Sequence, residues 1–293
     1  MNMKSISKIQ ANLKRYQIVY SSKTSNNVLD GSYKSVFKGR SMNFDEMREY
    51  APGDDIKDID WKASARTRKL YVRDYVAEKK HNVMFLFDSN LRMLADSEGM
   101  EEKRELAIMS AGTLAYFVEK NGDFVGATFA SDKGMKHFPL KTGLANIEQI
   151  LESYHHSCNE NNHSSLNNTL NYIVSNFRRR MIIIIVTDTE GLLSIPDATI
   201  RRLQVANDIL VINISDVDYK GKNMYSVKDG DYLPDFFTKD KKLINAAANN
   251  KQAAYQALNN KFKTFGIPHV NVDFLKEVDW ELINLLSNKR KMM

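Results

Sequence analysis

The sequence has 293 residues, a formal net charge of +6 at pH 7 and a charged fraction of 27%, values typical of a globular protein with one or two domains. The single cysteine, Cys158, excludes a disulfide within the chain and a zinc site built from several cysteines. The N-terminal segment has no apolar core of signal-peptide length, and no apolar run reaches the roughly 18 residues of a membrane helix. We therefore predict a cytoplasmic protein without a membrane span.

Positive charge is concentrated near the N-terminus. Residues 1–80 contain 17 Lys and Arg against 10 Asp and Glu, whereas the rest of the chain is nearly neutral. A basic segment can attract nucleic acid, so a nucleic-acid-binding protein is one alternative function. Scattered lysines are nevertheless more typical of a solvated surface, and we expect no nucleic-acid partner.

The first eighty residues predict a helix followed by an irregular segment. Apolar residues recur at helical spacing up to about residue 22, and the stretch from Ser21 to Ser32 has a composition typical of a loop. A dense polar segment with a short strand follows, from Arg40 to Arg73. We expect three of its apolar residues to be anchors, with the tryptophan as a lid over paired Arg and Asp side chains: Ile56, Ile59 and Trp61.

From Val83 onward, short apolar strands alternate with helices. The run Val83–Phe87 ends on Asp88, and a run of isoleucines ends just before Asp188. This alternation predicts an α/β fold, namely an open, mostly parallel sheet with helices on both faces. We expect two domains, residues 1–80 with the N-terminal helix and the irregular segment, and residues 81–293 with the sheet.

One segment resembles a known family. The stretch NFDEMREYAPGDDIKDIDWKASARTRKLYVRDY, from Asn43 to Tyr75, is similar to the hallmark of the bacterial domain-of-unknown-function 58 family. Members of this family are von Willebrand factor A-like proteins that often occur beside MoxR-type AAA+ ATPases. The resemblance continues through VMFLFDSN, NGDFVGATFA, RRRMIIIIVTDTEG and FGIPHVNVD. The hallmark positions are Arg48, Tyr50, Gly53, Asp54, Asp60 and Trp61.

The resemblance also implies a metal-ion-dependent adhesion site at the carboxyl edge of the sheet, where open parallel sheets bind ligands. Asp88 matches the first aspartate of the family's Asp-x-Ser-x-Ser motif, and Asp188 matches the last aspartate of the site. Asn90 replaces the first serine, and Ser164 takes the place of the threonine. These four residues predict a degenerate site for Mg²⁺ or Mn²⁺. Arg92 replaces the second serine and cannot ligate a cation, so the alternative is that the two aspartates pair with Arg92 or cap helix N-termini, with no ion present.

Motifs for ATP hydrolysis and for a serine nucleophile are absent from the sequence. We therefore expect a non-enzymatic adaptor that works with a MoxR-type ATPase in the assembly or maturation of a client. The enzymatic alternative is a divalent-metal-dependent hydrolase or nuclease that uses the acidic cluster Asp54–Lys62. The sequence specifies neither the client nor the oligomeric state.

Overall fold

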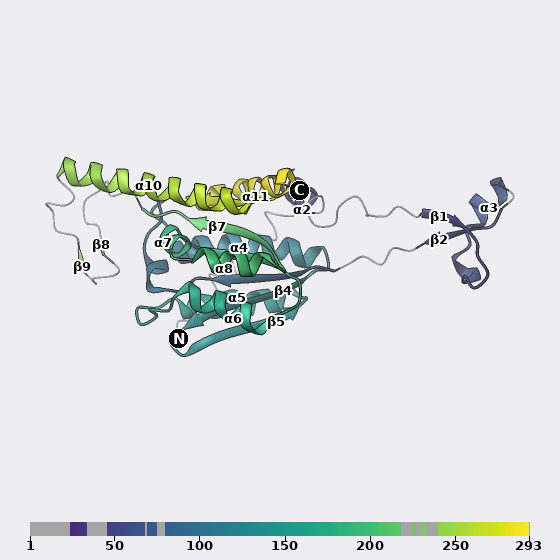
Figure 1. The fold of residues 1–293 in the computed structure, drawn as a ribbon, viewed down its shortest axis with the longest axis horizontal. Helices are drawn as coiled ribbons and strands as arrows, with labels where there is room; N and C mark the ends of the chain where they lie inside the picture. Colours follow the sequence, from purple (N-terminus) through teal and green to yellow (C-terminus); the bar gives the residue numbers. More distant parts are fainter. Residues whose placement is uncertain are drawn as a thin grey trace.

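A computed structural model describes residues 24–33, 46–67, 69–74, 80–217, 225–226, 231–232 and 240–292. The helix expected up to residue 22 lies outside the described residues. Figure 1 shows a body built on one sheet and a smaller unit set apart from it. Within the described ranges, no helix combines the length and the apolar character needed to cross a membrane.

The body contains a six-stranded sheet with the order β10-β7-β6-β3-β4-β5. Its strands are β3 (Asn82–Phe87), β4 (Phe124–Ser131), β5 (Gly134–Lys141), β6 (Ile182–Asp188), β7 (Asp208–Ile214) and β10 (His269–Val272). Neighbouring strands are parallel, except that β5 is antiparallel to β4. A separate antiparallel pair consists of β8 (Tyr225–Ser226) and β9 (Asp231–Tyr232).

Helices cover both faces of the sheet, as the sequence predicted. They are α2 (Thr24–Tyr33), α4 (Lys103–Lys120), α5 (Leu144–Ser157), α6 (Leu166–Asn176), α7 (Thr189–Leu193), α8 (Asp197–Gln204), α10 (Lys241–Phe265) and α11 (Val278–Met292), with the 3-10 turns η4 (Leu91–Leu94) and η5 (Leu275–Glu277). Alternate strand residues point to opposite faces. Phe85 and Phe87 pack with α2, α4, α5 and α11, whereas Met84 and Leu86 pack with α6, α7, α8 and α10. The expected α/β fold class is confirmed.

Elements α2 and β5 are among those that differ from the sequence predictions. Residues 24–33 form α2 where a loop was expected, because Leu29 and Tyr33 are buried against α4 and α11; tertiary packing here outweighs a weak local helix preference. Strand β5 was not predicted, since its side chains are mostly half-buried or exposed. Its lysines and Pro139 are typical of an edge strand.

Tyr33 attaches α2 to the body through a buried hydrogen bond. Its hydroxyl donates to Oδ2 of Asp123 at 2.7 Å, and the backbone N–H of His81 donates to Oδ1 at 2.9 Å. Asp123 is completely buried, so Tyr33→Phe removes a donor that water cannot replace. We expect this variant to lose about 1.5–3 kcal/mol of unfolding free energy, measured by urea denaturation. Tyr172→Phe, at a half-buried site on α6, is the control, and an equally small loss in both variants would contradict the prediction.

The smaller unit, residues 46–74, is called here the β1–β2 unit. It contains β1 (Glu46–Glu49), η3 (Ile56–Asp58), α3 (Trp61–Thr67) and β2 (Tyr71–Asp74), with β1 antiparallel to β2. Ile59 and Val72 are buried, and Oγ of Ser64 accepts a hydrogen bond from the backbone N–H of Tyr71 at 2.9 Å. The unit therefore has a small core of its own. The predicted domain boundary near residue 80 stays a prediction, although α2, which precedes it, packs on the body.

Candidate functional site

The two aspartates singled out in the sequence lie at the ends of neighbouring strands: Asp88 follows β3, and Asp188 is the last residue of β6. In the register of β3 and β6, Phe87 lies opposite Val186, so Asp88 and Asp188 leave the sheet at the same edge. The chain continues from β3 to β4 on one side and later returns to β6 on the other side. Open α/β sheets bind their ligands at such a change of direction, outside the carboxyl ends of the strands.

Arg92 joins the two aspartates. It lies on η4, directly after β3, and its Nη2 donates to Oδ2 of Asp88 at 3.0 Å, while its Nε donates to Oδ2 of Asp188 at 3.2 Å. Its Nη1 lies 3.8 Å from Oε1 of Glu190. The side chains thus adopt the arrangement that was the alternative to a metal site, in which Arg92 pairs with both acids.

Lys103 is a second cation at this edge, and sequence reasoning missed it. Its side chain is buried, and its Nζ donates to Oδ2 of Asp188 at 3.2 Å and also to Oδ1 of Asp216. Lys103 is the first residue of α4, where a positive charge opposes the helix dipole. That unfavourable placement was the one signal in the sequence that this lysine serves a tertiary contact. We call the set Asp88, Arg92, Lys103, Asp188 and Asp216 the Asp–Arg–Lys cluster.

The charges in the cluster shift one another's protonation. Burial and the nearby Asp188 raise the pKa of Asp88 by more than Arg92 lowers it. Burial also acts to raise the pKa of Asp188, but Lys103 and Arg92 outweigh it and hold that pKa below its usual range. For Lys103, burial acts to lower the pKa, yet the two facing aspartates raise it overall. Each buried charge therefore depends on its partners, because an unpaired charge here would be costly.

The oxygens that a metal ion would need already accept hydrogen bonds. Both carboxylate oxygens of Asp88 and both of Asp188 have donors at distances of 2.8–3.4 Å. The donors are the backbone N–H groups of Asn90 and Gly191, the hydroxyl of Thr187, and the side chains of Arg92 and Lys103. A guanidinium and an ammonium group contact these acids where a divalent cation would have to bind. These contacts do not fit Mg²⁺ or Mn²⁺.

Asn90 and Ser164, the other two predicted ligands, contact each other. Oδ1 of Asn90 accepts a hydrogen bond from the backbone N–H of Arg92 at 3.0 Å, and its Nδ2 donates to the carbonyl oxygen of Ser164 at 2.9 Å. Across the described part of the chain, no three His, Cys, Asp or Glu side chains gather in a way that could hold a metal ion. The four predicted ligands therefore lie at one edge of the sheet. Asn90 bonds to Ser164, whereas the two aspartates bond to Arg92 and Lys103.

The hallmark aspartates of the β1–β2 unit hold the backbone of their own turns. Oδ2 of Asp54 accepts from the N–H of Ala51 at 2.9 Å across the turn at Gly53, whose φ of 113° favours glycine. Oδ1 of Asp60 accepts from the N–H groups of Lys62 and Ala63, both at 3.0 Å, and so begins α3. The hydrolase alternative requires these acids to converge on an ion, and the structure gives it no support.

Two of the three predicted apolar anchors, Trp61 and Ile56, are not buried. Trp61 and Ile56 are 63% and 65% exposed, and only Ile59 of the three expected anchors is buried. The backbone N–H of Tyr50 donates to the carbonyl of Leu70 at 2.8 Å, which extends the pairing of the two strands. Arg48 lies on β1, and its side chain is outside the described part.

This protein is an α/β protein that has paired charges at the carboxyl edge of its sheet and a separate β1–β2 unit. The family described as "Protein of unknown function DUF58" matches residues 46–229, which is more than half of the chain. The chain belongs to this family, as its hallmark segment predicted.

Curated relatives match part of the chain, and two of them are described here. An uncharacterized protein of Mycobacterium tuberculosis is 29% identical over 126 residues, which are 43% of this chain and 39% of that protein. The uncharacterized protein YeaD of Bacillus subtilis is 27% identical over 106 residues, which are 36% of this chain and 24% of that protein. The match thus spans less than half the length of either relative.

Solved structures that resemble this chain at low sequence identity include the following two. The conserved hypothetical protein BatB from Bacteroides thetaiotaomicron has a TM-score of 0.46 and 18% identity, covering 72% of this chain and 99% of that chain. A von Willebrand factor type A structure from Catenulispora acidiphila has a TM-score of 0.39 and 12% identity, covering 73% of this chain and 44% of that chain.

Proposed function

We propose that this protein is a non-enzymatic interaction module that works with a MoxR-type AAA+ ATPase in the assembly or maturation of a client protein. Family membership supports the proposal, because the family resemblance implies an ATPase of this kind as partner. The Asp–Arg–Lys cluster is the observation that carries it. Its buried acids are held in ion pairs and hydrogen bonds, and these contacts fix the position of the charged side chains that are exposed at this edge.

Arg92 and Glu190 bring the cluster to the surface. The side chain of Arg92 is 29% exposed and that of Glu190 is 73% exposed. Glu190 lies on α7, which begins where Oδ1 of Asp188 accepts a hydrogen bond from the N–H of Gly191. The buried cluster therefore fixes the position of the exposed charge. Charges at the rim of an interface steer association and set its register, and this rim is the docking contact in our proposal.

A binding measurement with a charge reversal at the rim tests the proposal. Purified protein is titrated with a MoxR-type ATPase from the same cell, and Glu190→Lys should weaken the complex about tenfold, because it reverses the exposed charge beside Arg92 at the rim of the cluster. Glu119→Lys, near the end of α4 at the opposite edge of the sheet, is the matched control. Absence of a complex with the wild-type chain, or equal binding by Glu190→Lys, would refute the proposal.

A further inference from the structure

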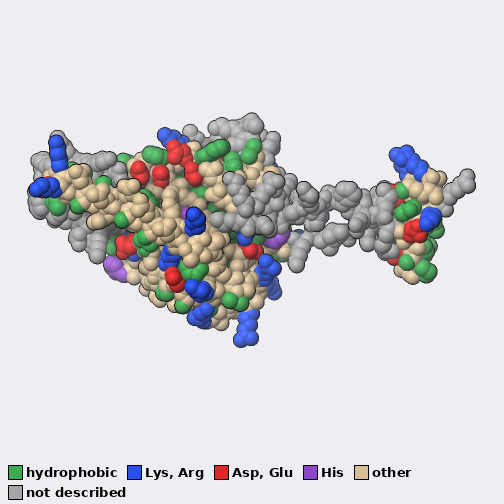
Figure 2. Space-filling model, turned by 45° about the horizontal axis from the view of Figure 1, so that its top comes forward, with side chains coloured by type: hydrophobic (Ala, Val, Ile, Leu, Met, Phe, Trp, Pro, Cys, Tyr) green, Lys and Arg blue, Asp and Glu red, His purple; other side chains and the backbone are tan. Residues whose placement is uncertain are grey.

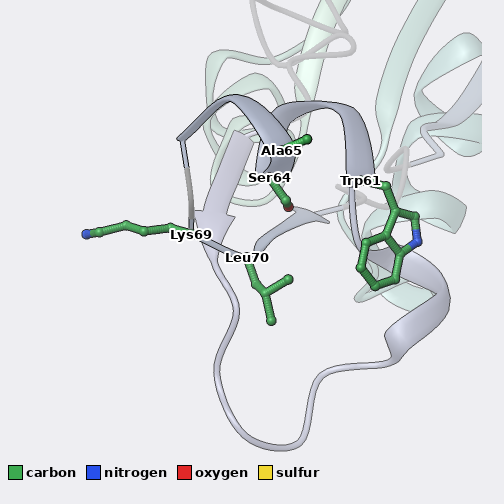
Figure 3. A pocket seen from close by; sticks show the side chains of 5 residues that line it. All are labelled: Trp61, Ser64, Ala65, Lys69 and Leu70. Atoms are coloured by element: carbon green, nitrogen blue, oxygen red, sulfur yellow. The ribbon is translucent and has the colours of Figure 1, made fainter.

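A second surface, on the β1–β2 unit, is not explained by the cluster. Trp61 and Leu70 are 63% and 45% exposed. They line a pocket of about 270 Å³ together with Ser64, Ala65 and Lys69. Figure 3 shows the side chains of Trp61 and Leu70 on the same side of the unit, whereas Lys69 extends away from them.

The exposure of Trp61 is not required by the fold of the unit. Its small core is supplied by Ile59 and Val72, and its turns are held by hydrogen bonds from backbone N–H groups to the side chains of Asp60 and Ser64. Trp61 and Ala65 are one helical turn apart and so share a face of α3. A large aromatic side chain left in water beside a pocket is typical of an interaction surface, and tryptophan is enriched among the residues that dominate binding energy.

The charges beside this pocket indicate the kind of ligand. Lys62 and Arg66 each follow a pocket residue in sequence, so a basic row lies next to the apolar row on α3. Both side chains are exposed. The ion pair described in this unit joins Lys69 to Glu49 and leaves the two basic side chains of α3 available. Figure 2 shows Lys and Arg side chains on the β1–β2 unit, with Asp and Glu side chains also present on this face.

We infer that this surface docks an acidic peptide segment of a partner protein. An apolar side chain of the segment enters the pocket beside Trp61, and flanking carboxylates contact Lys62 and Arg66. Nucleic acid is the less favoured ligand, because residues 46–74 hold 7 Lys and Arg and 7 Asp and Glu and so lack the excess positive charge that binds phosphates. The surface lies on a different unit from the Asp–Arg–Lys cluster and does not depend on the ATPase partnership.

A peptide selection tests the chemistry of this surface. Short random peptides displayed on phage are first depleted on the Trp61→Ala variant and then selected on the full wild-type chain. We expect the enriched peptides to share one large apolar residue flanked by Asp or Glu. Enrichment of basic peptides, or failure to find any peptide that distinguishes the wild type from Trp61→Ala, would overturn the inference.

The affinity of the best enriched peptide gives the size of the effect. Trp61→Ala should weaken binding about 30-fold, the loss expected for a dominant interface residue. Trp280→Ala is the matched control, because Trp280 is also 63% exposed but lies on α11 of the body, and it should leave the affinity unchanged. Equal losses in both variants would contradict a specific role for the pocket.

Circular dichroism and thermal melting show whether the unit stays folded in Trp61→Ala. A second variant tests the same surface without replacing Trp61. Lys62→Glu with Arg66→Glu alters only exposed side chains and should weaken the same peptide at least tenfold at low salt. Tight binding of the peptide by this double variant would overturn the assignment. The assignment would also be overturned if the protein selected no acidic peptide but bound random-sequence DNA or RNA in a way that depends on Trp61.

Discussion

Replacement of Lys103 by methionine should lower the free energy of unfolding by about 3–5 kcal/mol, the usual cost of removing one partner from a buried ion pair. The methionine keeps an unbranched, apolar side chain of similar length, but it removes the ammonium group that contacts Asp188 and Asp216. Asp188 is then a buried carboxylate with only Arg92 as a counter-charge. Urea denaturation of the two proteins at neutral pH measures the difference.

The pH dependence of this variant identifies the cause. In the wild type the pKa of Asp188 is lowered, so its contribution to stability is complete above the pKa of an unfolded aspartate and is lost as the pH falls through the folded pKa. In Lys103→Met the largest lowering influence is gone, so the pKa of Asp188 should rise relative to that in the wild type. Protonation of Asp188 then removes the buried charge that Lys103 no longer balances. The destabilisation should therefore shrink as the pH falls toward about 4.

Lys133→Met is the matched control, since Lys133 is exposed in the turn between β4 and β5. It should change stability by no more than about 0.5 kcal/mol, as is usual for surface substitutions. If Lys103→Met were no more destabilising than this control, or if its cost stayed constant with pH, Lys103 would not neutralise the buried acids.

Gly191→Ala should also destabilise the protein, by about 2–3 kcal/mol. An added Cβ would lie 2.8 Å from Oδ2 of Asp88 and closer still to the hydroxyl of Thr187. That hydroxyl donates to Asp88 at 2.8 Å, and the N–H of Gly191 donates to Asp188 at 2.9 Å. The methyl group would separate these contacts within a tightly packed region. Denaturant unfolding measures the loss.

The same substitution at Gly31 should have the opposite effect on the free energy of unfolding. Gly31 lies inside α2, and an added Cβ there would have no atom within 4 Å. Alanine restricts the unfolded chain more than glycine does, so Gly31→Ala should stabilise the protein by about 0.5–1 kcal/mol. If Gly191→Ala were as stable as Gly31→Ala, the absence of a side chain at residue 191 would not be needed for the contacts among Asp88, Thr187 and Asp188.

Local sequence pattern determined the α/β class and the position of the candidate site. The apolar runs that precede Asp88 and Asp188 predicted buried parallel strands, and parallel neighbours necessarily end at one edge. The hallmark segment identified the family, because its residues form a specific short pattern. Strand β5 escaped prediction, since an edge strand lacks a continuous apolar run.

Only the tertiary structure decided what surrounds the two aspartates and where Trp61 points. Lys103 is separated from Asp188 and Asp216 by long stretches of chain, and no local pattern couples a lysine on one helix to acids on other elements. The exposure of Trp61 depends on the packing of α3 against β2, in which Ile59 and Val72 fill the core instead. The periodicity of a sequence indicates which residues share a face of one helix or strand. Which charges pair, and which faces are covered, depends on contacts between elements that meet only in the folded chain.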